Sequence, residues 1–137
     1  MSIYDCKIIK LPKISDNRGS LSFVEEHEHI PFAIKRIYYL YDLPSGVERG
    51  AHGHKRLQQL MLPIAGSFDI VIDDGVGKQI YHLSRPNEGL YIAPMIWRLL
   101  KNFSNDAVCM VLASDLYDED DYFRQYADFM NYLEGRS

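Results

Sequence analysis

The chain has 137 residues, 47% of them hydrophobic and 25% charged, which suits one domain with a real core rather than two domains. Its formal net charge of −4 argues against broad nucleic-acid binding, which needs a basic surface, but leaves room for one anionic small molecule. No apolar run approaches the roughly 18 residues of a membrane span and no targeting signal opens the sequence. We therefore expect a cytoplasmic protein with neither a membrane nor a nucleic acid as partner.

Short strand patterns separated by turn residues run along most of the chain. We predict strands at residues 4–11, 20–25, 34–43, 49–54, 57–64, 67–73, 78–83, 89–93, 97–103 and 107–114. The segment Asp73-Asp-Gly-Val-Gly77 predicts a hairpin, because its glycines adopt positive φ at little cost. Cys6 and Cys109 lie far apart in the sequence, and we expect both to be reduced, buried thiols.

A single helix is predicted at the C-terminal end. The acidic run at 118–121 suits a helix N-terminus, where negative charge interacts favourably with the helix dipole. Apolar residues follow at helical spacing, at Tyr122, Tyr126, Phe129 and Leu133. Gly135 then fits just past the helix end. Many strands and one terminal helix predict a single all-β domain over residues 1–137, an antiparallel barrel or jelly roll closed by the helix.

His52 and His54 are the most informative residues of the sequence. They lie two apart in a predicted strand, so both imidazoles project from one face, about 7 Å apart at the backbone. Gly53 between them places no side chain on the opposite face. We interpret the other histidines, His27, His29 and His82, as ordinary loop or strand residues.

Three interpretations of this pair are possible: ordinary surface residues, a metal site and a proton-transfer site. A His-x-His in a strand is a common arrangement of metal ligands, and a metal-dependent cupin oxygenase would use it. In such barrels an acidic ligand follows a few residues later, but the candidate positions here, Gln58 and Gln59, are amides. We therefore predict no metal and favour a general base, for which a neutral imidazole is suited.

Five segments, in matching order over nearly the whole chain, resemble those of the cupin-type sugar 3,4-ketoisomerases, which act on dTDP-4-keto-6-deoxyglucose. They are DNRGSL (16–21), IKRIYY (34–39), RGAHGHK (49–55), GLYIAP (89–94) with Trp97, and VLASDLYDEDDY (111–122). The resemblance implies a cupin-type jelly-roll β-barrel and a homodimer with exchanged N-terminal strands. It also implies no cofactor, and a role in making 3-amino-3,6-dideoxy sugars for surface glycans.

The reaction that this resemblance implies needs a base, a donor and a dry pocket. The carbonyl at C4 acidifies the C3–H bond, so a neutral imidazole can remove that proton to give an enediol, and protonation at C4 leaves a ketone at C3. By match to the family motif, His52 is the predicted base. His54 would orient the substrate or relay protons to a sugar oxygen, and the two histidines could share the work.

The substrate requires cations for its diphosphate and flat side chains for its base and sugar. The candidate cations are Arg18, Arg36, Arg49, Lys55, Arg56 and Arg98. From the matched segments and their surroundings we predict as substrate-binding residues Arg18, Tyr38, Arg49, Lys55, Gln59, Tyr91, Trp97 and Arg98. Because strand residues alternate between faces, only one of Tyr38 and Tyr39 can point into the barrel, and we favour Tyr38.

The configuration of the product at C4 is a separate question. Proton return to the same ring face gives the galacto product, whereas the gluco product needs a donor on the opposite face. In the galacto branch of the family the positions of Arg18 and Arg98 are Arg and His, and in the gluco branch they are Tyr and Arg. This chain has Arg at both positions, so Arg18 matches the galacto branch and Arg98 matches the gluco branch. A charged arginine is a poor acid, which argues against either residue as the opposite-face donor, so we favour galacto. The alternatives are a related cupin sugar epimerase and a non-catalytic cupin that binds a nucleotide sugar.

Overall fold

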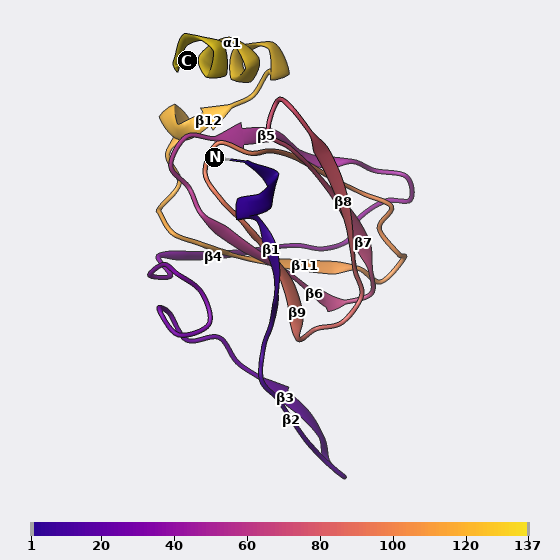
Figure 1. Cartoon of the computed structure of the whole chain (residues 1–137). Helices are drawn as coiled ribbons and strands as arrows, with labels where there is room; N and C mark the ends of the chain where they lie inside the picture. The colour runs from indigo at the N-terminus through magenta and orange to yellow at the C-terminus, as the bar shows by residue number, and fades with distance from the viewer. Residues whose placement is uncertain (1, 137) are drawn as a thin grey trace.

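The computed structural model describes residues 2–136, and two five-stranded antiparallel sheets packed face to face make up most of it (Figure 1). In spatial order, the first sheet consists of β1 (Lys7–Lys10), β9 (Glu88–Ile92), β6 (Gln59–Ala65), β11 (Val108–Ala113) and β4 (Arg36–Leu40). The second consists of β12 (Tyr122–Phe123), β5 (Arg49–His54), β10 (Trp97–Lys101), β7 (Phe68–Asp73) and β8 (Lys78–Leu83). The sheets do not join into one closed hydrogen-bonded barrel. The predicted all-β class and jelly-roll architecture are confirmed.

The remaining elements lie at the two ends of this sandwich. A hairpin of β2 (Lys13–Asp16) and β3 (Gly19–Ser22) projects from one end, and helix α1 (Tyr126–Arg136) lies at the other (Figure 1). Two 3-10 turns, Ile3–Asp5 and Glu119–Asp121, precede β1 and β12. In the part of the chain that is described, no helix is long and apolar enough to cross a membrane.

The core between the sheets follows from the strand patterns. In β7 the alternating residues Phe68, Ile70 and Ile72 are all fully buried, as the period of two in a half-covered strand requires. The strand β6, which pairs with a neighbour on each side, is buried at five successive positions. Cys6 and Cys109 are free, buried thiols, as predicted. Burial raises the pKa of Cys109 to about 12, so this thiol is not a nucleophile.

The predicted hairpin at 73–77 joins β7 to β8. Gly75 has φ of +89°, and its N–H donates to the carboxylate of Asp73. One carboxylate oxygen of Asp74 accepts from the backbone N–H groups of Val76 and Gly77. The chain reversal is therefore held by side-chain acceptors as well as by backbone pairing.

The C-terminal prediction is wrong in its details. The acidic run does not open the helix: Asp118 caps the 3-10 turn by accepting from the N–H of Asp120, and Tyr122 lies in β12. Helix α1 begins at Tyr126, and Gly135 lies inside it. The physical reason is pairing, since Tyr122 and Phe123 extend to pair with His54 and Gly53 of β5. The N-terminal strand is also shorter than predicted, and β2 was missed.

Helix α1 covers the outer face of β5 with a small second core. Phe129 is fully buried and packs on Trp97 and Phe123. A Cβ at Gly53 would lie 3.4 Å from the Phe129 ring, so this glycine lets the helix side chain approach the strand. The two histidines on either side of Gly53 accordingly project inward, away from the helix.

Candidate active site

The site is built around the last residues of β5. His52 pairs with Arg98 of β10, and His54 pairs with Tyr122 of β12, so the strand that carries both histidines lies between β10 and the edge strand β12. Their ring centroids are 4.9 Å apart and the rings are nearly perpendicular, at 87°. The prediction that both imidazoles share one face is confirmed. The Tyr122 ring contacts both, with centroids 5.1 Å from His52 and 4.2 Å from His54.

A buried arginine links the two sheets beside the histidines. Arg98 is 0% exposed; its Nε and Nη2 donate to the carbonyl of Ile96 at 3.3 and 3.2 Å, and its Nη1 donates to Oε1 of Gln59. Burial lowers the pKa of this guanidinium to about 10, so it stays charged at neutral pH. Gln59 lies on β6 of the first sheet, whereas the histidines lie on β5 of the second. Gln59 is therefore not on a strand next to the histidines; it faces them from the opposite sheet.

The hydrogen bond between Arg98 and Gln59 fixes the direction of the hydrogen bond between Gln59 and Tyr38. A guanidinium can only donate, so the amide oxygen of Gln59 faces Arg98 and its Nε2 faces the Tyr38 hydroxyl, 2.8 Å away. Nε2 donates there, and the hydroxyl oxygen accepts. The hydrogen of the Tyr38 hydroxyl is thus left free to be donated elsewhere. Burial raises the pKa of Tyr38, which keeps the phenol protonated.

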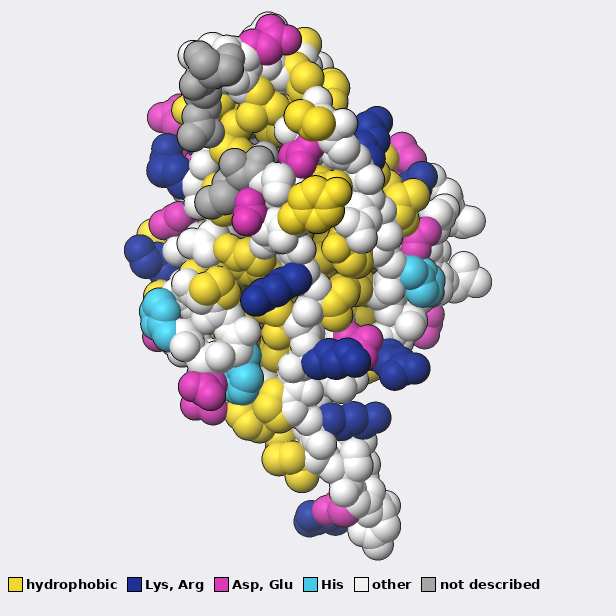
Figure 2. Space-filling view, viewed as in Figure 1, with side chains coloured by type: hydrophobic (Ala, Val, Ile, Leu, Met, Phe, Trp, Pro, Cys, Tyr) yellow, Lys and Arg dark blue, Asp and Glu magenta, His cyan; other side chains and the backbone are white. Residues whose placement is uncertain are grey.

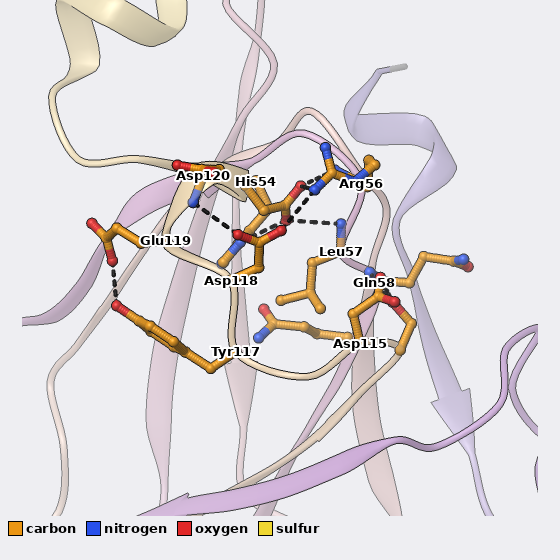
Figure 3. Close-up of polar contacts among 12 residues, drawn as sticks. His54, Arg56, Leu57, Gln58, Asp115, Tyr117, Asp118, Glu119 and Asp120 are labelled. Carbon is orange, nitrogen blue, oxygen red and sulfur yellow. Dashed lines mark hydrogen bonds and ion pairs between the residues drawn. The ribbon is translucent and has the colours of Figure 1, made fainter.

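A carboxylate that the sequence assigned to the helix is instead a partner of His54. The Asp121 side chain accepts from Nδ1 of His54 at 3.2 Å, and from the backbone N–H groups of Arg56 and Leu57 at 2.8 and 3.2 Å. Figure 3 shows this corner, in which the labelled residues His54, Arg56 and Leu57 lie close together; His54 contacts the carboxylate through its ring, and the other two through their backbone N–H groups. No local pattern could have revealed the pair, because its members are 67 residues apart.

The surroundings keep both imidazoles neutral. Burial, aided by the charges of Arg98 and Arg124, lowers the pKa of His52 to about 3. Burial and the charge of Arg98 also lower the pKa of His54. The Nε2 atoms of both rings are buried without a hydrogen-bond partner, and the imidazole of His52 forms no hydrogen bond with any residue between 2 and 136. Two bare imidazole nitrogens are therefore available to a ligand.

The histidines line two adjoining hollows that share Arg36, Tyr117 and Tyr122 as walls. The hollow beside His52, about 300 Å³, is also lined by Tyr38, Arg49 and Arg124, over a floor formed by Leu40, Met61, Leu100 and Val111. The hollow beside His54, about 400 Å³, includes Asp121 and Arg56. The guanidiniums of Arg36 and Arg124 lie over tyrosine rings: Arg36 over Tyr38 at 5.1 Å and Arg124 over Tyr122 at 4.0 Å. The hollow beside His52 thus has three arginines and no carboxylate in its lining.

The structure brings six of the ten predicted site residues together: Tyr38, Arg49, His52, His54, Gln59 and Arg98. It places the other four elsewhere in the single chain. Arg18 lies at the tip of the β2–β3 hairpin, paired with Asp16. The Lys55 ammonium lies over the rings of Phe123 and Tyr132.

The two other predicted aromatic residues of the site, Trp97 and Tyr91, also lie away from the histidines. Because Arg98 faces inward, its neighbour Trp97 faces outward, where it packs on Tyr126 and Phe129 of the helix. Tyr91 donates to Oε1 of Gln58 and packs on Phe32, away from the histidines. On β4 the expected choice is confirmed, since Tyr39 is 59% exposed and Tyr38 lines the hollow.

Sequence reasoning missed four pocket residues: Tyr117, Asp121, Tyr122 and Arg124. The first three fall inside the segment 111–122, whose resemblance to the family could have marked them as site residues. The spacing of apolar residues from Tyr122 onward suggested a helix instead. No cluster of three or more His, Cys, Asp or Glu side chains able to hold a metal occurs within the described residues.

Nearly the whole chain is similar to known proteins. The model of the FdtA family (WxcM-like, C-terminal) matches residues 4–134. The TDP-4-oxo-6-deoxy-alpha-D-glucose-3,4-oxoisomerase of Aneurinibacillus thermoaerophilus is 47% identical over 127 residues, which cover 93% of this chain and 91% of that protein.

Two solved structures share the fold and much of the sequence. A 3,4-ketoisomerase from Helicobacter canadensis superposes with a TM-score of 0.92 and 45% identity, covering 95% of this chain and 98% of the other. A mutant of the 3,4-ketoisomerase from Thermoanaerobacterium thermosaccharolyticum, in complex with TDP-4-keto-6-deoxyglucose, gives a TM-score of 0.93 and 37% identity, covering 97% and 96%.

The lowered pKa of His52 leads to a direct test. We expect the His52 ring of the native protein to show no titration between pH 5 and pH 8, because its pKa of about 3 leaves it neutral throughout. In urea the same ring should titrate near pH 6.5, about the value of an unperturbed histidine. The measurement is an NMR titration of the ring protons, assigned by their loss in His52→Asn. A native midpoint between pH 6 and 7 would contradict the buried, neutral site.

Proposed function

The chain belongs to the FdtA family (WxcM-like, C-terminal), and on this premise we propose that it is a dTDP-sugar 3,4-ketoisomerase that acts without a metal. It converts dTDP-4-keto-6-deoxy-D-glucose to a dTDP-3-keto-6-deoxyhexose. The observation that carries the proposal is the pair of neutral imidazoles with unpaired Nε2 atoms, set beside a tyrosine hydroxyl with a free hydrogen. This is the set of groups that an enediol reaction requires.

The first half of the reaction breaks the C3–H bond. Nε2 of His52 takes the proton, the bonding electrons form the C3–C4 double bond, and the C4 carbonyl oxygen gains the negative charge. The Tyr38 hydroxyl donates its hydrogen to that oxygen. Gln59 holds the hydroxyl in the required orientation, since its amide occupies the acceptor side of the phenol oxygen.

The second half returns the proton to carbon. His52 gives its proton to C4, and the C3 hydroxyl loses its hydrogen as the C3 ketone forms. His54 receives that hydrogen and relays it back to Tyr38, so that no proton is gained or lost overall. The apolar floor and the roof of Tyr117 and Tyr122 limit water around the enediol.

Arginines of the His52 hollow provide for the diphosphate. Arg49 and Arg36 present planar donors to phosphate oxygens. The third arginine of the lining, Arg124, is already paired with the carboxylate of Glu119. Arg98 has a different task, because all of its contacts are to Ile96 and Gln59. We assign no substrate contact to Lys55, Tyr91 and Trp97, because their side chains contact residues away from the histidines.

We assign the galacto configuration to the product. In this proposal His52 takes and returns the proton on a single face of the sugar ring, which inverts C4 relative to the gluco sugar. Arg98 is charged and fully buried, which excludes it as an acid on the opposite face. The 3-keto group then suits an aminotransferase reaction that leads to 3-amino-3,6-dideoxy sugars for surface glycans, in the cytoplasm where nucleotide sugars are made.

A homodimer with exchanged N-terminal strands belongs to the same proposal. The projecting hairpin exposes Ile14 and Leu21, which are 61% and 57% accessible. Beside its base, an apolar groove of about 560 Å³ includes Phe23, Ile37 and Met110 in its lining. Figure 2 shows hydrophobic side chains gathered where the hairpin meets the sheets. A second copy would cover these side chains and carry Arg18 toward the partner's site.

The reaction itself is the first test. We expect the purified protein, with chelator present, to convert dTDP-4-keto-6-deoxyglucose to a 3-keto product. The measurement is proton NMR of the reaction in ordinary water. A small coupling between H4 and H5 identifies the galacto sugar, and a large one would reject that assignment. Inversion at C3 or C5 would indicate an epimerase instead. Loss of activity in chelator would indicate a metal enzyme. Substrate that stays unconverted in heavy water and exchanges no hydrogen for deuterium would indicate a binding protein.

The role of His52 is tested by substitution. We expect His52→Asn to lower kcat by about 10²- to 10⁴-fold, the usual loss for removal of a general base. The matched control is His82→Asn, which removes an exposed imidazole bonded only to Asp69 on β7 and should leave kcat unchanged. Near wild-type turnover of His52→Asn together with an inactive His54→Asn would reverse the two assigned roles.

The exchanged hairpin is tested by complementation. If Arg18 acts in the partner's site, His52→Asn and Arg18→Ala chains should each be nearly inactive alone. Co-expressed, they should recover up to about a quarter of wild-type activity, because each mixed dimer regains one intact site. No recovery from two inactive variants, or a monomeric mass by light scattering, would reject the exchange.

A further inference from the structure

Asp121 has a buried carboxylate whose two oxygens accept hydrogen bonds from backbone N–H groups and from one histidine ring. It is 6% exposed, and the backbone N–H of Arg56 donates to one of its oxygens while that of Leu57 donates to the other. Its own backbone carbonyl accepts from the N–H of Lys55. The residue is therefore anchored to the chain just after β5, at both its side chain and its backbone.

These contacts determine which nitrogen of His54 carries the hydrogen. A carboxylate held by two backbone donors can only accept, so Nδ1 of His54, 3.2 Å away, must donate to it. In a neutral imidazole the other nitrogen, Nε2, is then bare. That atom is buried and has no hydrogen-bond partner among the described residues.

The neighbouring imidazole lacks this constraint. The centroid of the His52 ring lies 4.9 Å from that of His54, and the charge of Arg98 lowers the pKa of both rings. The His52 ring, however, has no hydrogen bond to any described residue. Asp121 thus marks the main difference between two otherwise similar rings. A carboxylate on the far nitrogen also stabilises a transient imidazolium, as it does in other histidine–carboxylate pairs.

We propose that Asp121 is a positioning residue for the isomerisation: it holds His54 in the Nδ1–H tautomer, so that Nε2 of His54 meets the sugar as a hydrogen-bond acceptor. His54 then receives a hydroxyl hydrogen and cannot present one at the start of the reaction, while the unconstrained His52 handles the carbon-bound proton. This inference rests on the proposed ketoisomerase function. It adds a residue that sequence reasoning did not include among the site residues.

Asp121→Asn tests the proposal with little change in shape. The asparagine oxygen can still accept from a backbone N–H, but its amide can donate to Nδ1 and so favours the Nε2–H tautomer of His54. We expect kcat to fall by roughly 10²-fold or more, as in other carboxylate-to-amide changes behind a histidine. The dissociation constant of dTDP, measured calorimetrically, should change by less than about twofold, since Asp121 does not line the hollow of the arginines.

The tautomer itself is the decisive readout. Long-range ¹H–¹⁵N correlation spectra should show protonated Nδ1 and bare Nε2 for His54 in the wild type, and the reverse in Asp121→Asn. The signals are assigned by their loss in His54→Asn. The control is Asp120→Asn, the same chemical change at an exposed neighbour outside both hollows, which should alter neither the tautomer nor kcat.

Three outcomes would overturn the proposal. They are an Nε2–H tautomer of His54 in the wild type, unchanged kcat in Asp121→Asn, or a loss of kcat with the tautomer unaltered, which would indicate a structural role only. If Asp121→Asn does not fold, the wild-type spectrum still decides. A wild-type protein that fails to isomerise the sugar would reject the proposed function, and the spectrum would remain a separate test of the Asp121–His54 pair.

Discussion

The guanidinium of Arg98 is the charge around which the interior of this protein is organised. Removing a charge from water costs several kcal/mol, and here it is compensated by the Ile96 carbonyl and the Gln59 amide oxygen. Because an arginine can only donate, it sets the orientation of Gln59 and, through Gln59, that of the Tyr38 hydroxyl. The same charge opposes protonation of both imidazoles. One buried cation therefore orients the Tyr38 hydroxyl and favours the neutral state of both histidines.

The local features of the fold could be read from the sequence, because they depend on residues close together in the chain. The shared face of His52 and His54 follows from the period of two in a strand, and the hairpin at Gly75 from its turn chemistry. Alternation also selected Tyr38 over Tyr39. These predictions needed no knowledge of which strands become neighbours.

The features that were missed depend on long-range contacts, or run against the usual burial of apolar residues. Trp97 and Arg98 are adjacent on β10, and hydrophobicity alone would place the tryptophan inside and the arginine outside. The reverse occurs, because helix α1 supplies a second apolar core for Trp97 and Gln59 supplies an acceptor for Arg98. Likewise, the acidic run at 118–121 is typical of a helix start, and only pairing with a strand 67 residues earlier turns Asp121 toward His54.

The short strand β12 connects the helix with the pair of histidines. Its two residues face opposite ways: the Tyr122 ring lies against His52 and His54, whereas Phe123 belongs to the core beneath Phe129. A two-residue strand has little pairing of its own, so the helix acts as the clamp that keeps the tyrosine in place. Fraying of the last turns on heating would then loosen the wall of the pocket while both sheets stay intact. Inactivation would precede melting, and the temperature range of the enzyme would be set by eleven residues outside the sandwich.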